Sequence, residues 1–154
     1  MDVFKIATLN INGLASRTKV EMLEEFLFQR EIDILFLQEV AHSTIDKLRS
    51  YKIYKNMETA GRRTAMVTRN EITITNITML PSERGITEEY RGICLINIYA
   101  PPGIAKRQER ELFYNNELPY LLRTSPSNMI VGDFNCVLRQ TALDTPNIVR
   151  RSTY

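Results

Sequence analysis

The sequence feature that most constrains the fold is a nearly unbroken apolar run at residues 33–38 (DILFLQ). Such a run is typical of a β-strand buried on both faces, which requires packed layers on either side of its sheet. Residues 3–11 (VFKIATLNI) alternate and predict an earlier strand, and an amphipathic helix ending near Arg30 separates the two. Strand, helix and strand with short connections predict a βαβ-like unit.

The sequence also predicts how this helix begins and which side chains it buries. Thr18 and Glu21 have the spacing of a capping box, with Thr18 as the N-cap. Apolar residues then recur at helical spacing, so we expect them in the core. These residues are Val20, Leu23, Phe26 and Leu27.

The remaining pattern predicts more strands and one more helix. The expected elements are strands at residues 62–69, 72–79, 91–99 and 129–131, a loop at 81–89 and a helix at 106–118. Two turn-favouring residues at 70–71 separate the first two of these strands. Consecutive prolines at 101 and 102 end the next strand, and Pro119 kinks or ends the helix. The expected buried stripe of the helix is Leu112, Phe113, Leu121 and Leu122.

Composition narrows the class of protein. A chain of 154 residues predicts one domain, residues 1–154, and the 44% hydrophobic and 25% charged residues are typical of a globular protein. Cys94 and Cys136 fit no zinc spacing and suggest a reducing compartment. No apolar run is long enough to span a membrane and no secretory signal is evident, so we expect an intracellular protein, nuclear or cytoplasmic, without a membrane partner.

Polar residues stand where several of the predicted strands end. Val131 to Asn135 (VGDFN) passes from an apolar run to Asp133 and Asn135, which share one side by the period of two. Two interpretations are open for this stretch: a turn that uses Asp and Asn for backbone capping, or a pair that positions a water molecule. Asn10, Glu39 and Tyr99 end other strands. If the first two strands run parallel, Asn10 and Glu39 meet at one rim.

Carboxylate and amide oxygens at these strand ends suit a hard divalent cation. Mg²⁺ typically takes one or two carboxylates together with water and substrate phosphate, and Mn²⁺ can take its place. A metal on Glu39 would polarise a phosphoryl oxygen while Asp133 activates a water molecule. This combination indicates phosphodiester hydrolysis.

Four motifs in this order resemble the endonuclease/exonuclease/phosphatase superfamily. They are LNING (9–13), LQE (37–39), IYAP (98–101) and GDFN (132–135). LNINGL, IYAPP and VGDFNCVL are similar to the apurinic/apyrimidinic-like endonuclease domain of LINE-type (non-LTR) retrotransposons. The resemblance implies an α/β protein, a two-sheet α/β sandwich (DNase I-like) flanked by helices. It also implies Mg²⁺-dependent nicking of a DNA substrate and a reverse transcriptase domain in the parent polyprotein.

The resemblance also implies a role for each strand-end residue. Glu39 would bind the metal, with Asn10 beside it in the metal and phosphate site. Tyr99 would contact the scissile phosphate. Asp133 would position and deprotonate the water, and Asn135 would orient that acid or stabilise the phosphorane.

One departure from the family pattern shapes the expectation. The family has a further acidic residue and a terminal Ser-Asp-His motif after GDFN, whereas this chain ends at Tyr154 without one. His42 lies in the wrong place for that role, and Asp144 is no substitute for the acid. We therefore expect a C-terminally truncated domain with an open sheet edge, an apolar face and impaired activity.

Two alternatives remain open from the sequence. The first is a catalytically inactive nucleic-acid-binding relic that uses basic side chains as phosphate contacts. Those side chains are Arg62, Arg63, Lys106, Arg107 and Arg110. The second alternative is a phosphomonoesterase or lipid phosphodiesterase branch of the same superfamily.

Overall fold

The computed structural model describes residues 4–14, 16–40, 45, 48, 50–55, 63–123 and 127–136. The strands are β1 Ile6–Asn10, β2 Ile34–Val40, β3 Tyr51–Lys55, β4 Arg63–Arg69, β5 Thr75–Met79, β6 Gly85–Tyr90, β7 Ile93–Tyr99 and β8 Ser127–Asp133. The helical segments are α1 Arg17–Arg30, η2 Ile104–Lys106, α2 Arg107–Leu112, η3 Phe113–Glu117 and η4 Leu118–Leu121.

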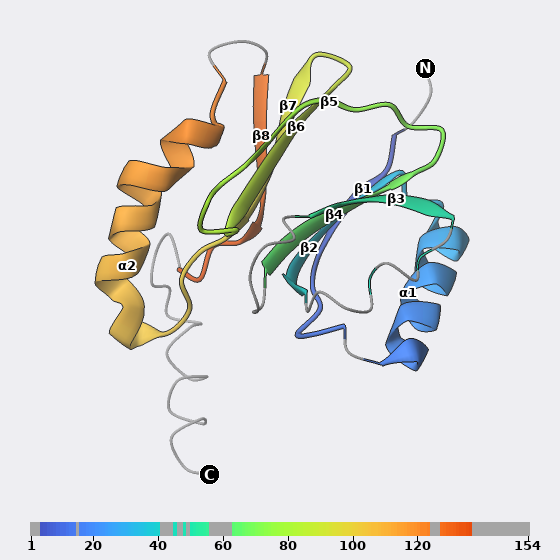
Figure 1. The fold of residues 1–154 in the computed structure, drawn as a ribbon, viewed down its shortest axis with the longest axis horizontal. Helices are drawn as coiled ribbons and strands as arrows, with labels where there is room; N and C mark the ends of the chain where they lie inside the picture. The colour runs from blue at the N-terminus through green and yellow to red at the C-terminus, as the bar shows by residue number, and fades with distance from the viewer. Residues whose placement is uncertain are drawn as a thin grey trace, which may run out of the picture.

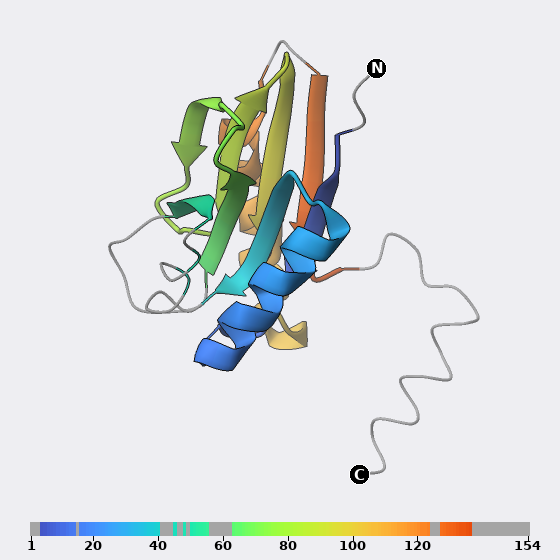
Figure 2. The same ribbon diagram turned by 90° about the vertical axis from the view of Figure 1, so that its right-hand side faces the viewer.

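The described strands form two sheets that face each other. The first has the order β1-β2-β4-β3 and the second the order β5-β6-β7-β8. Helix α1 lies on the outer side of the first sheet, and the segment that contains α2 lies on the outer side of the second (Figure 1). The view in Figure 2 shows α1 running across its sheet. This is the expected two-sheet α/β sandwich of DNase I type.

The βαβ prediction is confirmed. β1 and β2 are parallel neighbours, with Ile6 opposite Ile34 and Asn10 opposite Gln38. The apolar run of β2 is buried on both faces, because alternate side chains enter different cores. Leu35 and Leu37 pack toward α1, whereas Ile34 and Phe36 point between the two sheets.

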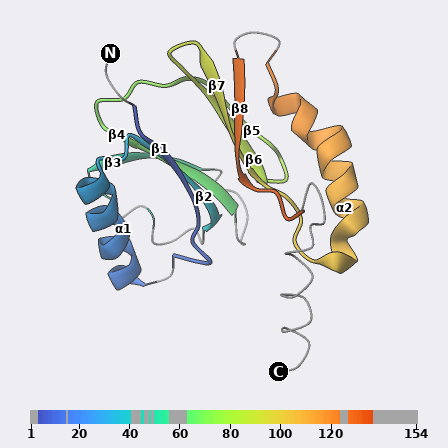
Figure 3. The same ribbon diagram turned by 180° about the vertical axis from the view of Figure 1, so that it is seen from behind.

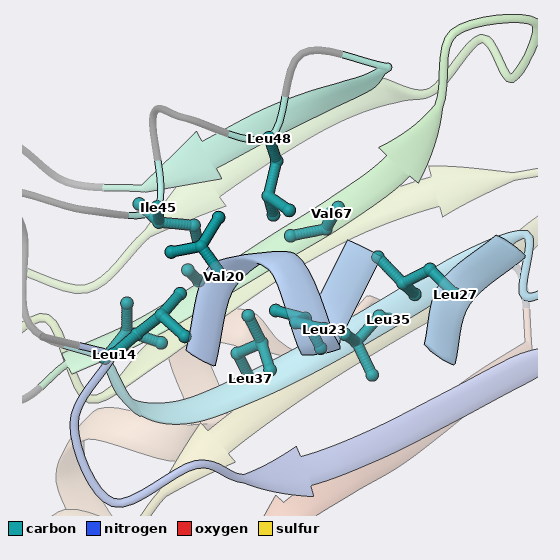
Figure 4. Packing of buried hydrophobic residues seen from close by; sticks show 11 residues of the cluster. Leu14, Val20, Leu23, Leu27, Leu35, Leu37, Ile45, Leu48 and Val67 are labelled. Atoms are coloured by element: carbon teal, nitrogen blue, oxygen red, sulfur yellow. The ribbon is translucent and has the colours of Figure 1, made fainter. Parts of the chain in front are cut away.

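Helix α1 packs on the first sheet through an apolar core (Figure 4). Its buried side chains are Val20, Leu23 and Leu27, as the spacing predicted. Phe26 was expected to be buried with them, but it is 41% exposed because it stands at the margin of the helix face. The N-cap is Ser16, not Thr18. Its Oγ accepts a hydrogen bond of 3.2 Å from the backbone N–H of Lys19.

The segment at residues 81–89 was predicted as a loop, and this was wrong. Residues from Gly85 onward form β6, which pairs with β7 along its whole length. The polar side chains in this stretch concealed the strand, since Thr87 and Glu88 are buried by packing within the sandwich. Tertiary contact overrides a low strand propensity here.

Two other strand predictions need correction, and one strand was not predicted. The strand predicted at 72–79 begins only at Thr75, and Ile72 and Ile74 reach the core from the connection before it. The strand predicted at 91–99 begins at Ile93, after a turn. β3 carries no clear alternation and was not predicted.

The second helical segment is continuous in sequence but changes type. It passes through 3-10, α, π and 3-10 geometry, and the last change falls at Leu118, next to Pro119. Phe113 and Leu121 are buried against the second sheet as predicted. The prediction was wrong for Leu112 and Leu122, which are 58% and 42% exposed.

β1 and β8 end their sheets in the described part of the chain, and Figure 3 shows both from behind. Met129 on β8 and the following Phe134 are partly exposed. No helix in the described ranges combines the length and apolarity that crossing a membrane requires. His42, Arg62 and Asp144 lie outside the described residues.

Candidate active site at the strand ends

Four strands from the two sheets bring their carboxyl-terminal ends together. β1 ends at Asn10 and β2 carries Glu39 just before its end, so these residues come from the first sheet. Tyr99 ends β7 and Asp133 ends β8, and these two residues are register partners in the parallel β7–β8 pair. Both parallel pairs therefore deliver their last polar side chains to the same edge of the sandwich.

Asn10 connects the two acids of this cluster. Its Nδ2 donates to Glu39 Oε1 at 3.1 Å and to Asp133 Oδ2 at 2.9 Å. The two carboxylates therefore lie within hydrogen-bond reach of one nitrogen atom. An amide hydrogen between two acids places partial positive charge where like charges would otherwise repel each other.

Glu39 reaches this position through an irregularity in β2. The register between β2 and β4 shifts between Leu37 and Val40, so β2 carries one extra residue. Glu39 has φ of +57°, an uncommon conformation for a residue other than glycine. A β-bulge re-aims the side chain it carries, and bulges are frequent beside active sites.

Tyr99 also contacts Glu39. Its hydroxyl donates to Glu39 Oε1 at 3.1 Å. Burial raises the pKa of Tyr99 above its ordinary value of 10, and the hydrogen bond and charge of Glu39 raise it further. The phenol therefore keeps its proton at neutral pH and acts as a hydrogen-bond donor. The Arg84 guanidinium lies 5.5 Å from the centre of the Tyr99 ring.

Asp133 is oriented on both of its oxygens. Oδ1 accepts the backbone N–H of Asn135 at 3.0 Å, and Oδ2 accepts Asn10 Nδ2. The Asn135 side chain does not join the cluster. Its Nδ2 donates to the carbonyl of Ala100 at 2.7 Å and so ties the end of β8 to the end of β7.

Gly132 permits the close approach of β8 that places Asp133. It has φ of +130°, and a Cβ at this position would lie 2.0 Å from the carbonyl oxygen of Ile98. No other residue fits without displacing the backbone of β7. The glycine of the GDFN motif is thus a requirement of strand packing.

The same side chains serve both interpretations of the strand ends, the capped turn and the polar cluster. Asn10 Oδ1 accepts the backbone N–H of Asn12 at 3.1 Å, as in a capped turn, while Nδ2 of the same side chain binds both acids. Asp133 likewise caps Asn135 and faces Asn10. Local capping fixes the side-chain rotamers that the cluster needs.

A polar network that runs from the surface to the buried side chains of Gln38 and Asn97 was missed by sequence analysis. It consists of Thr8, Gln38 and Asn97, which are joined by hydrogen bonds across the sandwich. The available signal was Asn97 itself, an amide inside the apolar run CLINIY of β7. No pattern in the sequence marked its partners.

The basic side chains that were considered as phosphate contacts are engaged within the protein. Four of the five lie in the described residues. Their partners are Glu83 for Arg63, Glu109 for Lys106, Glu111 for Arg107, and the carbonyls of Pro101 and Gly103 for Arg110. A basic nucleic-acid-binding face built from these four residues is therefore not favoured.

The sequence matches a known protein family, and the fold is similar to that of several solved structures. The sequence model of the Endonuclease/Exonuclease/phosphatase family matches residues 7–153. A search of curated protein sequences gave no match. Solved structures with a similar fold include an AP endonuclease from Archaeoglobus fulgidus, with 21% identity and a TM-score of 0.64 over 86% of this chain and 58% of that one.

Two further structures are similar. Humanized TDP2 from D. rerio has 17% identity and a TM-score of 0.67 over 94% of this chain and 66% of that one. A 3' phosphatase from Neisseria bound to product DNA hairpin has 18% identity and a TM-score of 0.62 over 86% of this chain and 58% of that one. These likenesses show the fold, and the chain spans less than two thirds of the length of each of these proteins.

Proposed function

Because the chain belongs to the endonuclease/exonuclease/phosphatase family, we propose that it is a Mg²⁺-dependent endonuclease that hydrolyses phosphodiester bonds of DNA. The observation that carries the proposal is the contact of Asn10 Nδ2 with both Glu39 and Asp133. It joins residues of three strands and two sheets into one cluster of oxygen-bearing side chains.

The donor chemistry of the cluster fits a hard divalent cation. Glu39 is the proposed metal ligand, with Asn10 beside it. No group of three acidic, histidine or cysteine side chains able to hold a metal occurs among the described residues. One or two carboxylates supplemented by water and phosphate are the usual protein ligands of Mg²⁺. The cation, when bound, supplies positive charge that polarises a phosphoryl oxygen.

Asp133 is the proposed general base. Its two oxygens are held by the N–H of Asn135 and by Asn10 Nδ2, so the carboxylate has a fixed direction. In the proposed step Asp133 accepts a proton from water as the water oxygen attacks phosphorus, the bond from phosphorus to the leaving oxygen breaks, and the leaving oxygen takes a proton from solvent. Positioned proton transfer of this kind typically contributes a factor of about 10²–10⁴ in rate.

Tyr99 and Asn135 have supporting roles in this proposal. Tyr99 remains a neutral phenol, donates to Glu39 and is the proposed contact to the scissile phosphate. Asn135 orients Asp133 through its backbone N–H, and its side chain holds the end of β7. Both act by positioning groups before the reaction, since neither has to change its protonation state.

Nicking of supercoiled plasmid with Mg²⁺ tests the proposal. We expect Asp133→Ala and Glu39→Gln to lower the rate by about 10²–10⁴. Glu111→Gln is the matched control, because it makes the same acid-to-amide change on the exposed surface of α2. Nicking by the unmodified chain at no more than the rate of Asp133→Ala contradicts the proposal. Salt-sensitive DNA binding without nicking would favour the inactive relic instead.

We further propose that the nicked DNA is the target site of a LINE-type retrotransposon. The support is the resemblance of LNINGL, IYAPP and VGDFNCVL to such endonuclease domains. The proposal predicts that the genomic reading frame which encodes this chain also encodes a reverse transcriptase. A frame without one contradicts the retrotransposon role but leaves the nuclease proposal standing.

A further inference from the structure

Asn97 lies between the two sheets, and both the nitrogen and the oxygen of its side-chain amide form hydrogen bonds. It lies in the middle of β7, is 0% exposed and faces the first sheet. Its Nδ2 donates to the carbonyl oxygens of Leu37 and Ala65, each at 3.0 Å. Because carbonyl oxygens only accept hydrogen bonds, these two contacts require the amide nitrogen of Asn97 to face Leu37 and Ala65.

The two acceptors stand at the bulge that aims Glu39. Leu37 and Ala65 are the last register partners of β2 and β4 before the shift, and the next pair joins Val40 to Arg63. An interrupted ladder leaves backbone groups without their regular partners, and an unpaired buried carbonyl is costly. The amide nitrogen of Asn97 donates hydrogen bonds to two carbonyls beside this interruption.

The other end of the Asn97 amide is held as well. Gln38 Nε2 donates to Asn97 Oδ1 at 2.7 Å and to Thr8 Oγ1 at 3.0 Å. Gln38 is 2% exposed and precedes Glu39 directly in the chain. Leu37, the last paired residue before the shift, and Gln38, the first residue within it, are therefore bonded to one side chain of the opposite sheet.

We propose that Asn97 is a positioning residue for the site, and that it holds the β2 bulge in the conformation in which Glu39 can bind a divalent cation. The proposal deepens the function proposed above and rests on it for the role of Glu39. The bulge alone leaves Glu39 at positive φ, which costs free energy that surrounding contacts must offset. A satisfied buried amide linked to both strands of the bulge provides those contacts.

Two measurements on the full chain test this role. The first is amide hydrogen exchange of Gly13, whose N–H donates to the Glu39 carbonyl at 2.8 Å and so reports the backbone of the bulge. The second is direct binding of Mn²⁺, followed by electron paramagnetic resonance of the free ion. Asn97→Asp replaces the donor with an oxygen, and Asn97→Ala is the second variant in case the first does not fold.

We expect both variants to accelerate Gly13 exchange and to weaken Mn²⁺ binding, each by about tenfold or more, as is typical when a side chain that orients a metal ligand is lost. Ile86→Val is the control. Ile86 faces the same interior from β6, is 2% exposed and is the register partner of Asn97, so the substitution lowers stability beside Asn97 while it leaves the Asn97 amide in place. Ile86→Val should leave the Gly13 exchange rate and the Mn²⁺ affinity within about twofold of those of the unmodified chain.

The outcomes separate this proposal from the proposed function. Exchange and Mn²⁺ affinity that match the Ile86→Val control overturn the role of Asn97, even if the chain nicks DNA. Faster Gly13 exchange with unchanged Mn²⁺ affinity also overturns it. If the unmodified chain binds no Mn²⁺, the metal-dependent function fails. Gly13 exchange that responds to Asn97 then still supports the hold of Asn97 on the bulge.

Discussion

Asn10 and Asp133 are 123 positions apart in the sequence and are joined by a hydrogen bond of 2.9 Å between Asn10 Nδ2 and Asp133 Oδ2. The bond links the last residue of β1 to the last residue of β8, which are the outermost strands of the two sheets among the described residues. The same nitrogen reaches Glu39. Within the described cluster, the Asn10 amide is therefore the side chain that holds Glu39 and Asp133 together.

Changing Asn10 to aspartate is expected to set three carboxylates against one another. Asn10→Asp should lower the free energy of unfolding at pH 7 by about 1–3 kcal/mol without divalent cations, because the shared donor is replaced by a like charge. Mg²⁺ at millimolar concentration should restore part of this loss, since a bound cation stabilises the folded state. Urea unfolding with and without Mg²⁺ measures both effects.

The control for this change is Asn115→Asp, which adds the same charge at an exposed position of η3. It should change stability by less than about 0.5 kcal/mol and should not respond to Mg²⁺. Equal behaviour of the two variants would show that the Asn10 amide does not join the acids in solution.

Tyr99→Phe removes one hydrogen bond to Glu39 without opening a cavity. Stability should fall by only about 0.5–1.5 kcal/mol. The nicking rate should fall by about tenfold or more, because Glu39 loses a donor that orients it. Burial and Glu39 hold the pKa of Tyr99 above 10, so the rate of the unmodified chain should show no loss from Tyr99 ionisation between pH 7 and 9. Tyr120→Phe, on a side chain 75% exposed, is the comparison.

Gly132→Ala is expected to disrupt the packing of β8 on β7. The added Cβ would lie 2.0 Å from the Ile98 carbonyl oxygen, and the φ of +130° adds backbone strain. We expect a loss of about 3 kcal/mol or more in the free energy of unfolding. Gly92→Ala isolates the strain, since Gly92 has φ of +75° with nothing within 4 Å, and should cost about 1 kcal/mol. Equal losses in the two variants would contradict the steric explanation.

Glu88 should make the stability of the fold depend on pH. It is 1% exposed, and neither carboxylate oxygen has a hydrogen-bond partner among the described residues. Burial raises its pKa from 4.5 to about 8. Between these values the unfolded chain releases the proton while the folded chain keeps it. The free energy of unfolding therefore falls as the pH rises from about 4.5 to 8, and the loss levels off above that range.

Chemical unfolding at several pH values measures this effect. Each unit of pKa difference corresponds to about 1.4 kcal/mol, so a fall of a few kcal/mol is expected. Glu88→Gln should flatten the profile over the same range because it removes the ionisable group. Glu71→Gln, at an exposed position, should leave the profile unchanged. A fall that persists in Glu88→Gln would assign the pH dependence to other groups.

Local periodicity predicted the first half of the fold well. The double burial of β2 and the buried stripe of α1 follow from residues that repeat with the period of a strand or a helix. The same approach failed for β6, because Thr87 and Glu88 are polar residues that are buried on opposite faces of the sheet, and only the folded protein buries them. It also failed for Phe26, whose exposure depends on how the helix is rotated over its sheet.

In the candidate site, too, some features follow from local patterns and others depend on distant segments. Local patterns predicted the candidate residues Asn10, Glu39, Tyr99 and Asp133, because each follows an apolar strand, a relation that is local in the chain. Two other features depend on segments at least 32 positions apart. The Asn135 side chain bonds to the Ala100 carbonyl, and the Asn97 side chain bonds to the carbonyls at the bulge. No local pattern encodes such a distance.

The sequence by itself thus predicted every strand except β3 and β6, and it predicted the βαβ path of β1 and β2 and the polar residues at the strand ends, because these properties depend on neighbouring residues. Only the tertiary structure decided that both sheets present their strand ends at one edge, that the β2 bulge turns Glu39 toward Tyr99 and Asn10, and that Asn97 supports the bulge. These features require contacts between the two sheets, and such contacts exist only once the sandwich has closed.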